Sequence, residues 1–466
     1  MLISEDKIEM HQYITEISKY GIAGAMALFT IVTILGLFSK ENRQKMLYVW
    51  QCALIFLIQL LCFLNLALVS RKIEYVFFYV FVQIFLLVSA IMVPMIYEDV
   101  NRPLLGGMCM LMGVGLCIVS RLNFNRAIRQ YIIALISLII ALLIPYLFSR
   151  IRFFKKLTWV YGLLGIAMLS TVLILGEITY GSKLSFTVSF DIAQVTFQPS
   201  EFVKILFVFY LAGALWDDVS FVKIGITAVI AGMHVIILVL SRDLGSAVIF
   251  FIGYVFIVFI ATRNYLYLLI GAVGGCAASW SAYQLFAHVR TRVLAWRDPW
   301  TYIDNQGYAI TQSLFAIGSG SWFGMGLMQG KPDDIPYVME DFIFSSVCEE
   351  LGVIFGICVV LVTVGMFLVM MQIAAQIQDR FYQIIVYGVG VMYIFQIFLT
   401  VGGGIKLIPL TGVTLPFVSY GGSSVMVSMI MFFIVQGIYI RLKQEGTKHN
   451  VSKKQKFKGS KTGKKN

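Results

Sequence analysis

Long apolar runs separated by short polar segments are the dominant pattern of this chain. Thirteen such runs occupy residues 20–38, 47–69, 75–97, 104–120, 130–148, 158–176, 199–216, 222–240, 244–261, 264–287, 341–374, 382–402 and 416–440. A helix of about 20 apolar residues crosses a bilayer and satisfies its own backbone hydrogen bonds there. Continuous apolar character also excludes the alternating pattern of membrane β-strands. The pattern predicts an all-α, polytopic integral membrane protein with about 13 transmembrane helices.

The composition agrees with this prediction and narrows the class of protein. Hydrophobic residues make up 59% of the 466 residues and charged residues 13%. Soluble domains carry about 25% charged residues, and a soluble core of this size could not hold so much apolar surface. A water-soluble enzyme and a disordered chain are therefore both excluded.

Most of the formal net charge of +12 lies at one end of the chain. Residues 441–466 contain ten Lys or Arg and one Glu, which is +9 of the +12. Because this segment has almost no apolar residues, we expect a disordered tail over 442–466. A basic segment directly after a membrane span is typical of contact with anionic headgroups, so membrane lipids are an expected partner and no nucleic acid is expected.

Lys and Arg in the short loops predict the orientation of the spans. The basic loops at 39–45 and 150–156 fall on the same side as the tail when thirteen spans are counted. This places the N-terminus outside and the C-terminus in the cytoplasm. The outer loops at 70–72 and 121–129 are also basic and run against the rule.

One long hydrophilic stretch, residues 288–340, falls on the outer side between two spans. Loops longer than about 15 residues in compact proteins are usually functional. This one brings Arg292, Arg297 and Asp298 close together in sequence, and the next apolar run opens with Asp341. Carboxylates act as general bases or hold divalent cations, and arginines pair with phosphate. The stretch therefore indicates an enzyme that handles an anionic lipid headgroup.

Other ionisable residues lie at the ends of spans. Glu201 and Lys204 are three residues apart at the start of the run at 199–216, so they share a helix face and can pair. Asp243 belongs to a tight outer turn before the run at 244–261. Charges within a membrane are functional by default, but the spacing of Glu201 and Lys204 fits a structural ion pair equally well.

Several motifs, taken in order along the chain, resemble those of the SEDS family, whose members are FtsW, RodA and SpoVE. They are Gln198-Pro-Ser-Glu-Phe-Val-Lys204, Asp243-Leu-Gly245, Arg292 with Asp298-Pro299, Asp341-Phe-Ile-Phe344 with Glu349-Glu350-Leu-Gly352, and Pro409-Leu-Thr-Gly412 with Leu415-Pro-Phe-Val-Ser-Tyr-Gly-Gly-Ser-Ser424. The resemblance runs from about residue 104 to 441. It implies a core of about ten helices over 101–441, with its large extracellular loop at 288–340 and about three extra helices in 1–100.

The chain departs from the family pattern at two places. Gly181-Ser-Lys183 is followed by Leu184 rather than by the family's usual Arg-Trp, and Arg242 replaces the usual proline before Asp243. The substrate contact expected of that tryptophan is therefore not carried over to this chain.

The resemblance implies a peptidoglycan glycosyltransferase of the bacterial cell membrane. Such enzymes polymerise lipid II, an undecaprenyl-pyrophosphate glycolipid, at the outer face during division, elongation or sporulation. Their usual partner is a class B penicillin-binding protein, a transpeptidase. The family's essential aspartate maps onto Asp298, either as the catalytic general base or as the ligand of a divalent cation, Mg²⁺ or Mn²⁺.

The remaining candidate residues form two groups. The expected contacts of substrate pyrophosphate are Arg292, Arg297, Lys204 and Lys406, and the expected structural or cavity residues are Glu201, Asp243, Asp341, Glu349, Glu350, Ser419 and Ser423. Two alternative functions stay open. One is a transporter that flips lipid II, because charges lining a cavity suit either role, and the other is a non-catalytic scaffold for a penicillin-binding protein.

Overall fold

The computed structural model describes residues 2–150, 153–179, 182–189 and 194–462, and it describes side chains over 13–150, 153–176 and 197–445. Its long helices are α1 (Leu2–Leu37), α2 (Glu41–Ser70), α3 (Glu74–Ile96), α4 (Arg102–Leu122), α5 (Phe124–Arg150), α6 (Thr158–Leu175), α7 (Pro199–Leu215), α8 (Phe221–Leu240), α9 (Leu244–Thr262), α10 (Leu266–Leu285), α14 (Val353–Gln376), α15 (Arg380–Gly404) and α16 (Gly422–Thr462). Within the described residues, 12 helices are long and apolar enough to cross a membrane. With α7, which has 17 residues, they account for the thirteen expected spans and confirm the polytopic membrane fold.

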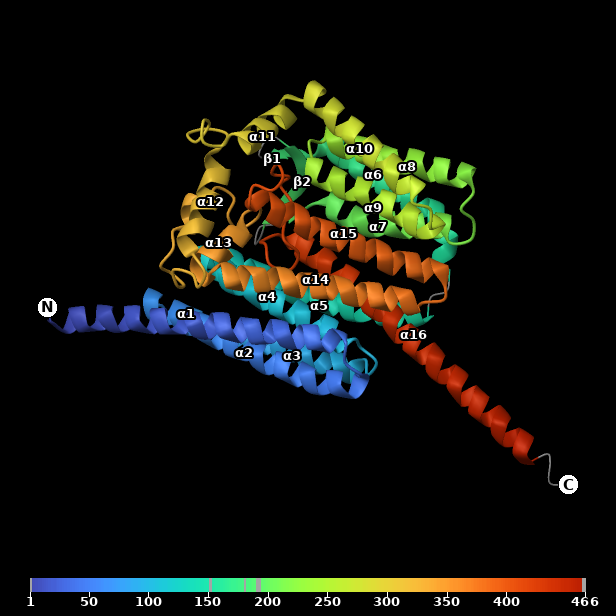
Figure 1. Cartoon of the computed structure of the whole chain (residues 1–466), viewed down its shortest axis with the longest axis horizontal. Coiled ribbons are helices and arrows are strands. Elements are labelled where there is room, and N and C mark those ends of the chain that lie inside the picture. The colour runs from blue at the N-terminus through green and yellow to red at the C-terminus, as the bar shows by residue number, and fades with distance from the viewer. Residues whose placement is uncertain (1, 151–152, 180–181, 190–193, 463–466) are drawn as a thin grey trace.

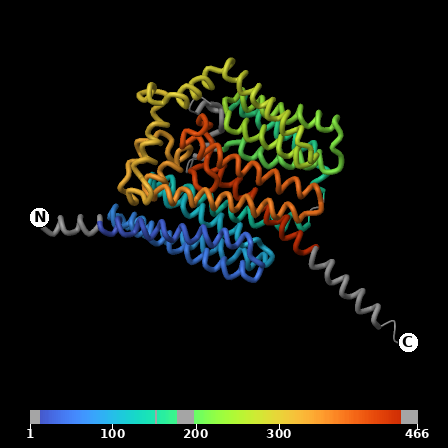
Figure 2. Tube along the Cα trace, in the orientation of Figure 1, coloured from blue at the N-terminus to red at the C-terminus, as the bar shows by residue number. Residues whose placement is uncertain are grey.

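The spans run side by side as one bundle (Figure 1). α1, α2 and α3 pack together at one edge and contact the rest of the bundle mainly through α4 and α14. α8, α9 and α10 lie toward the opposite edge. The long loop between α10 and α14 contains α11 (Ala287–Arg297), α12 (Tyr308–Gly320), the 3₁₀ turn η2 (Pro332–Asp334) and α13 (Ile343–Leu351). α11, α12 and α13 gather at one end of the bundle, and α16 leaves at the other end (Figure 2).

α4 comes from the shortest apolar run and is the most completely buried span, with its whole membrane window inside the bundle. Its glycines allow neighbouring elements to approach closely. A Cβ at Gly107 would lie 2.7 Å from the Met366 side chain of α14, and one at Gly115 would lie 2.6 Å from the carbonyl oxygen of Phe417. Small residues at such positions are typical of helix packing within membranes. The glycine content of this run therefore reflects central packing.

The apolar run at 341–374 is not a single helix. It divides into α13 and α14 at Gly352, whose φ is 93°, a backbone conformation that glycine adopts readily. The break lets the preceding loop pair with both helices: the Gly326 N–H donates to the Glu350 carbonyl (3.0 Å) and the Val353 N–H donates to the Ser321 carbonyl (3.0 Å). Hydrophobicity alone did not reveal the break because the run is largely apolar on both sides of it.

A small antiparallel sheet between α6 and α7 adds to the all-α fold. Its strands are β1 (Glu177–Thr179), β2 (Ser182–Ser189) and β3 (Gln194–Phe197), hydrogen-bonded in that order. The sequence analysis missed it, although apolar and polar residues alternate from Leu184 to Ser189, which is the pattern of a strand. Gly181 of the Gly-Ser-Lys motif lies outside the described residues.

α16 continues along the basic C-terminal segment to Thr462. The disorder expected of the tail over 442–466 stays a prediction. A 3₁₀ turn, η1 (Phe154–Leu157), joins α5 to α6 near the same end of the bundle.

Candidate functional site

Helix α11 of the long loop carries Asp298 at its C-terminal end. The Trp296 indole N–H donates to the Lys406 carbonyl (3.1 Å), and the Arg292 guanidinium donates to the Thr411 carbonyl (3.1 Å). These two side chains are four residues apart and so share one face of the helix. These two hydrogen bonds therefore hold α11 alongside the segment 406–412.

The Asp298 side chain is exposed and ionised. Its carboxylate accepts hydrogen bonds from the Thr301 hydroxyl (2.7 Å) and the Thr301 N–H (3.3 Å). These bonds, with a smaller contribution from the Lys406 charge, lower the pKa of Asp298 below its usual value. Arg297 precedes it in the chain and is also exposed. The structure therefore places Asp298 near the Lys406 charge, with the exposed Arg297 directly before it in the chain.

A second carboxylate lies at the other end of the segment 406–412. A Cβ built on Gly412, whose φ is 76°, would lie 3.8 Å from Asp341 Oδ2 and 3.9 Å from Arg292 Nη2. Burial raises the pKa of Asp341 to about 7, the neighbouring Glu340 contributes in the same direction, and Arg292 opposes them. The structure thus brings Arg292 and Asp341 together, although they are 49 positions apart in the sequence.

The start of α7 supplies two buried polar links. The Ser200 hydroxyl donates to Asp243 Oδ2 (3.1 Å), and Asp243 caps α9 by accepting from the Ser246 N–H (3.1 Å). One turn further, Lys204 Nζ lies 2.8 Å from Glu201 Oε2 and donates to Gln396 Oε1 (2.8 Å).

The predicted Glu201–Lys204 pair is confirmed as an ion pair, and both side chains are buried. The ammonium of Lys204 is engaged inside the bundle, between α7 and α15. A direct contact of Lys204 with substrate pyrophosphate therefore has no support in this geometry.

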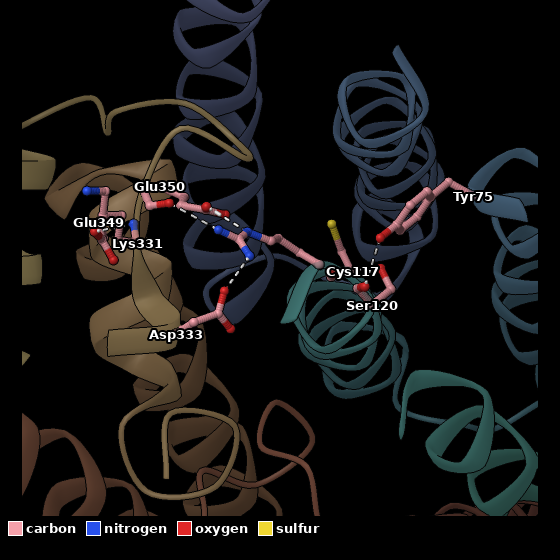
Figure 3. A network of polar contacts seen from close by, with 9 residues as sticks. Tyr75, Cys117, Ser120, Lys331, Asp333, Glu349 and Glu350 are labelled. Carbon is pink, nitrogen blue, oxygen red and sulfur yellow. Dashed lines mark hydrogen bonds and ion pairs between the residues drawn. The ribbon is translucent and has the colours of Figure 1, made fainter. Parts of the chain in front are cut away.

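Glu349 and Glu350 belong to a separate network, shown in Figure 3. Arg121 Nε donates to Glu350 Oε1 (2.8 Å), Arg121 Nη1 lies 3.2 Å from Asp333 Oδ2, and Glu349 Oε1 accepts from the Lys331 N–H (2.9 Å). These contacts connect α4, α13 and the loop around η2. The two glutamates therefore hold the long loop in place and do not join the group around Asp298.

Ser419, before α16, and Ser423, in its first turn, connect this part of the chain to its neighbours. The Ser419 hydroxyl donates to the Glu340 carbonyl and accepts from the Leu415 N–H (2.8 Å). The Ser423 hydroxyl accepts from the Gln198 N–H (3.0 Å), next to the start of α7. Both serines thus make contacts between segments that are distant in the sequence.

Sequence reasoning missed two residues that the structure places in these networks. Gln396, the partner of Lys204, is a single amide within an apolar run, and polar residues in a span are a weak signal of such pairing. Arg121 stood out in the sequence only as an exception to the positive-inside rule. Its pairing with Glu350 and Asp333 explains why the bundle keeps a cation there.

The residues that the structure describes contain no group of three or more His, Cys, Asp or Glu able to hold a metal ion alone. Mg²⁺ is commonly bound by one or two carboxylates together with substrate phosphates. The exposed carboxylate of Asp298 fits such a shared site.

Comparison with known proteins agrees with this arrangement. The family model FTSW_RODA_SPOVE, described as "Cell cycle protein", matches residues 103–444. Peptidoglycan glycosyltransferase RodA of Mycobacterium leprae is 31% identical over 356 residues, which cover 71% of this chain and 75% of that protein. A probable peptidoglycan glycosyltransferase FtsW of Pseudoalteromonas translucida is 30% identical over 360 residues, covering 73% of this chain and 88% of the relative.

Two solved structures share the fold. One, described as "Structural coordination of polymerization and crosslinking by a peptidoglycan synthase complex", matches with a TM-score of 0.62 and 23% identity, covering 74% of this chain and 99% of that one. The other, the rod shape determining protein RodA of Thermus thermophilus, matches with a TM-score of 0.55 and 22% identity, covering 73% and 96%. Nearly all of each solved chain is thus matched by about three quarters of this one. The family match spans α4 to α16, the bundle that positions Asp298, Arg292 and Asp341. The chain therefore belongs to the FtsW/RodA/SpoVE family.

Proposed function

We propose that this chain is a peptidoglycan glycosyltransferase that polymerises lipid II, an undecaprenyl-pyrophosphate glycolipid, at the outer face of the cell membrane. Its family and its curated relatives support this activity. The observation that carries the proposal is the exposed, ionised Asp298 beside Lys406 and Arg297, on the long loop between two spans. Two cations and a carboxylate at the end of a membrane bundle suit a lipid-linked substrate with a pyrophosphate leaving group.

In this reaction a sugar hydroxyl attacks the anomeric carbon of a second sugar, and the bond from that carbon to pyrophosphate breaks. Negative charge develops on the leaving pyrophosphate, where Lys406 and Arg297 would bind it. Asp298 would hold Mg²⁺ or Mn²⁺ at the same place, and the cation would neutralise part of that charge. Arg292 and Lys204 instead bind groups of the protein, so they position the site.

The proposed orientation places the N-terminus and α11–α13 outside and the C-terminus in the cytoplasm. Two contacts support it by gathering basic loops at the end where α16 leaves the bundle. Lys443 Nζ lies 3.1 Å from Glu41 Oε2, and Lys155 Nζ lies 2.9 Å from Asp379 Oδ2. Basic residues concentrate on the cytoplasmic side of membrane proteins.

A class B penicillin-binding protein is the proposed partner. The solved complex that matches this fold is described as coordinating polymerisation and crosslinking. Crosslinking is the chemistry of a transpeptidase, which supports a partner of that class for this chain. Lipid flipping and a purely scaffolding role are the competing functions that the following experiment separates.

The test uses purified full-length chain, labelled lipid II, and Mg²⁺ or Mn²⁺, with and without a partner transpeptidase. We expect glycan polymer from the wild type and an initial rate at least about 100-fold lower in Asp298→Ala. Asp304→Ala is the matched control, because Asp304 is an exposed aspartate of the same loop; it should retain polymerisation.

Equal and negligible polymer from the wild type and Asp298→Ala in every condition would contradict the glycosyltransferase. Transfer of lipid II across liposome membranes by the same preparation would then favour the transporter. Absence of both activities, with retained binding of the transpeptidase, would favour the scaffold.

A further inference from the structure

Helix α12 of the long loop buries one face and leaves the opposite face largely exposed. Its buried residues are Ile310, Thr311, Ser313, Ala316 and Gly320. The opposite side, the α12 face, follows the spacing of one helix side and consists of Tyr308, Gln312, Phe315 and Ser319. Tyr308 is 38% exposed and Phe315 is 50% exposed, although α12 is not among the membrane spans. Exposed apolar groups that cluster in this way mark contact with a ligand, a partner or the membrane surface.

The α12 face continues to the candidate site through Trp300. This residue lies two positions after Asp298 and is 52% exposed, and its ring centroid is 5.8 Å from that of Phe315. The turn between them is compact, because a Cβ on Gly307 would lie 2.4 Å from the Pro299 carbonyl oxygen. The turn therefore holds the Trp300 ring close to both the carboxylate and the α12 face.

The buried side of α12 fixes the helix relative to the same site. The Ser313 hydroxyl donates to the Gly404 carbonyl (2.8 Å) and is hydrogen-bonded to the Ser345 hydroxyl of α13 (2.6 Å). Gly404 ends α15 and comes two residues before Lys406, whose charge acts on Asp298. α12 also lies beside α11 and α13 in Figure 1. The helix is thus attached to the site at two places, the turn after α11 and the end of α15.

The chemistry of the α12 face suits a saccharide. The C–H surface of a sugar ring stacks on the electron-rich face of an aromatic ring, and a side-chain amide such as that of Gln312 both donates and accepts hydrogen bonds, as sugar hydroxyls require. None of the four residues of the face is charged. Tyr308 and Phe315 are seven residues apart, about 10 Å along the helix, which is room for two linked sugar rings.

The membrane surface is the competing occupant, and Trp322 of the same loop shows what such a contact looks like. Trp322 is 63% exposed, and its carbonyl accepts from the Ile354 N–H (3.1 Å) in the first turn of the span α14. It therefore lies level with the end of a span, where Trp and Tyr gather at the lipid headgroups. Trp300 instead adjoins an ionised carboxylate near a lysine. This position favours the saccharide for the α12 face.

We propose that Trp300 and the α12 face bind the saccharide of the lipid-linked glycan strand whose pyrophosphate is held at Asp298, an inference that rests on the proposed glycosyltransferase function. The saccharide is joined to its pyrophosphate through the anomeric carbon, so its first sugar lies beside Asp298 and the following sugars reach the α12 face. After each transfer, the new lipid-linked end has to move to Asp298. Stacking on Trp300 and Phe315 keeps the strand bound during this movement, so these residues set the length of the product.

The experiment measures the length distribution of the strands that the full chain makes from labelled lipid II with Mg²⁺, with substrate in large excess. Trp300→Leu and Phe315→Leu should each shorten the mean strand by about threefold to tenfold, because weaker stacking speeds dissociation of the strand. Phe315→Tyr keeps a ring and should restore the wild-type length. Trp322→Leu is the matched control and should leave the length unchanged.

A second measurement separates the saccharide from the membrane surface. The chain is placed in phosphatidylcholine vesicles with brominated acyl chains, and the fluorescence of each Leu variant is subtracted from that of the wild type to isolate one tryptophan. Bromine should quench Trp322, at the end of a span, and should not quench Trp300.

Strands of wild-type length from both Trp300→Leu and Phe315→Leu would overturn the proposal. So would equal shortening by Trp322→Leu, or quenching of Trp300 by brominated lipid. If thermal unfolding shows that the Leu variants do not fold, Gln312→Ala decides in their place, and it should also shorten the strands. Failure of the proposed function looks different, because the wild type would then make no polymer at all.

Discussion

Two Arg–Glu pairs at the end of the bundle that carries the long loop differ mainly in burial, and this difference predicts unequal stability effects. Arg121 and Glu350 are 2.8 Å apart, with side chains 10% and 0% exposed, whereas Arg126 and Glu340 are 3.0 Å apart and 38% and 28% exposed. Removing one partner of a buried pair leaves an uncompensated charge and costs about 3–5 kcal/mol. An exposed pair contributes about 0–1 kcal/mol. We therefore expect Arg121→Gln to destabilise the protein about three times as much as Arg126→Gln, or more.

The size of the Arg121 effect follows from its three contacts. Its guanidinium binds Glu350, Asp333 and the Gly330 carbonyl (3.1 Å), so one substitution releases α4 from both the η2 loop and α13. Thermal unfolding in detergent measures the loss for each variant. Adding Glu350→Gln to Arg121→Gln should recover part of it, because the buried charge is removed. Equal losses for the two arginine variants, or no recovery in the double variant, would refute the reasoning.

Two further predictions concern the long loop. Gly352→Ala should lower the free energy of unfolding by roughly 2–5 kcal/mol, because φ is 93° and the new Cβ would lie 2.5 Å from the Gly324 nitrogen. Gly24→Ala is the control: a Cβ there would meet no atom within 4 Å, so this variant should lose little stability in the same thermal assay. Tyr20→Ala removes a ring contact of 5.0 Å with Phe323 and should speed hydrogen exchange at the Met325 amide by about threefold to tenfold. Unchanged exchange there would show that α1 does not brace the loop.

The sequence alone was enough to predict the membrane fold, the candidate residue Asp298 and the pairing of Glu201 with Lys204. Each of the thirteen apolar runs contains one long helix, although the run at 341–374 also holds the short helix α13. Length and hydropathy are enough to predict the spans because hydrocarbon forces every span to satisfy its own backbone hydrogen bonds. The motifs around Asp298 indicated the family, and the three-residue spacing of Glu201 and Lys204 was enough to predict their pairing.

Hydropathy and helix spacing did not predict the contacts between segments that are distant in the sequence. The sequence assigned Arg292 to pyrophosphate and Asp341 to the cavity, but only the packing of α11 along 406–412 places both of them beside Gly412. Likewise, Glu350 helps to hold the loop because the packing of α4 places Arg121 beside it, although the two residues are 229 positions apart in the chain.

The physical reason is that hydropathy and helix periodicity describe how one segment meets lipid, and they contain no information about which segments become neighbours. Burial and neighbouring charges then decide what each carboxylate can do. Asp298 and Asp341 are the same residue type in the sequence, but exposure and the Thr301 bonds keep one ionised, while burial gives the other a pKa of about 7. The sequence supplies the chemical groups, and the tertiary structure assigns their roles by controlling their access to water and to one another.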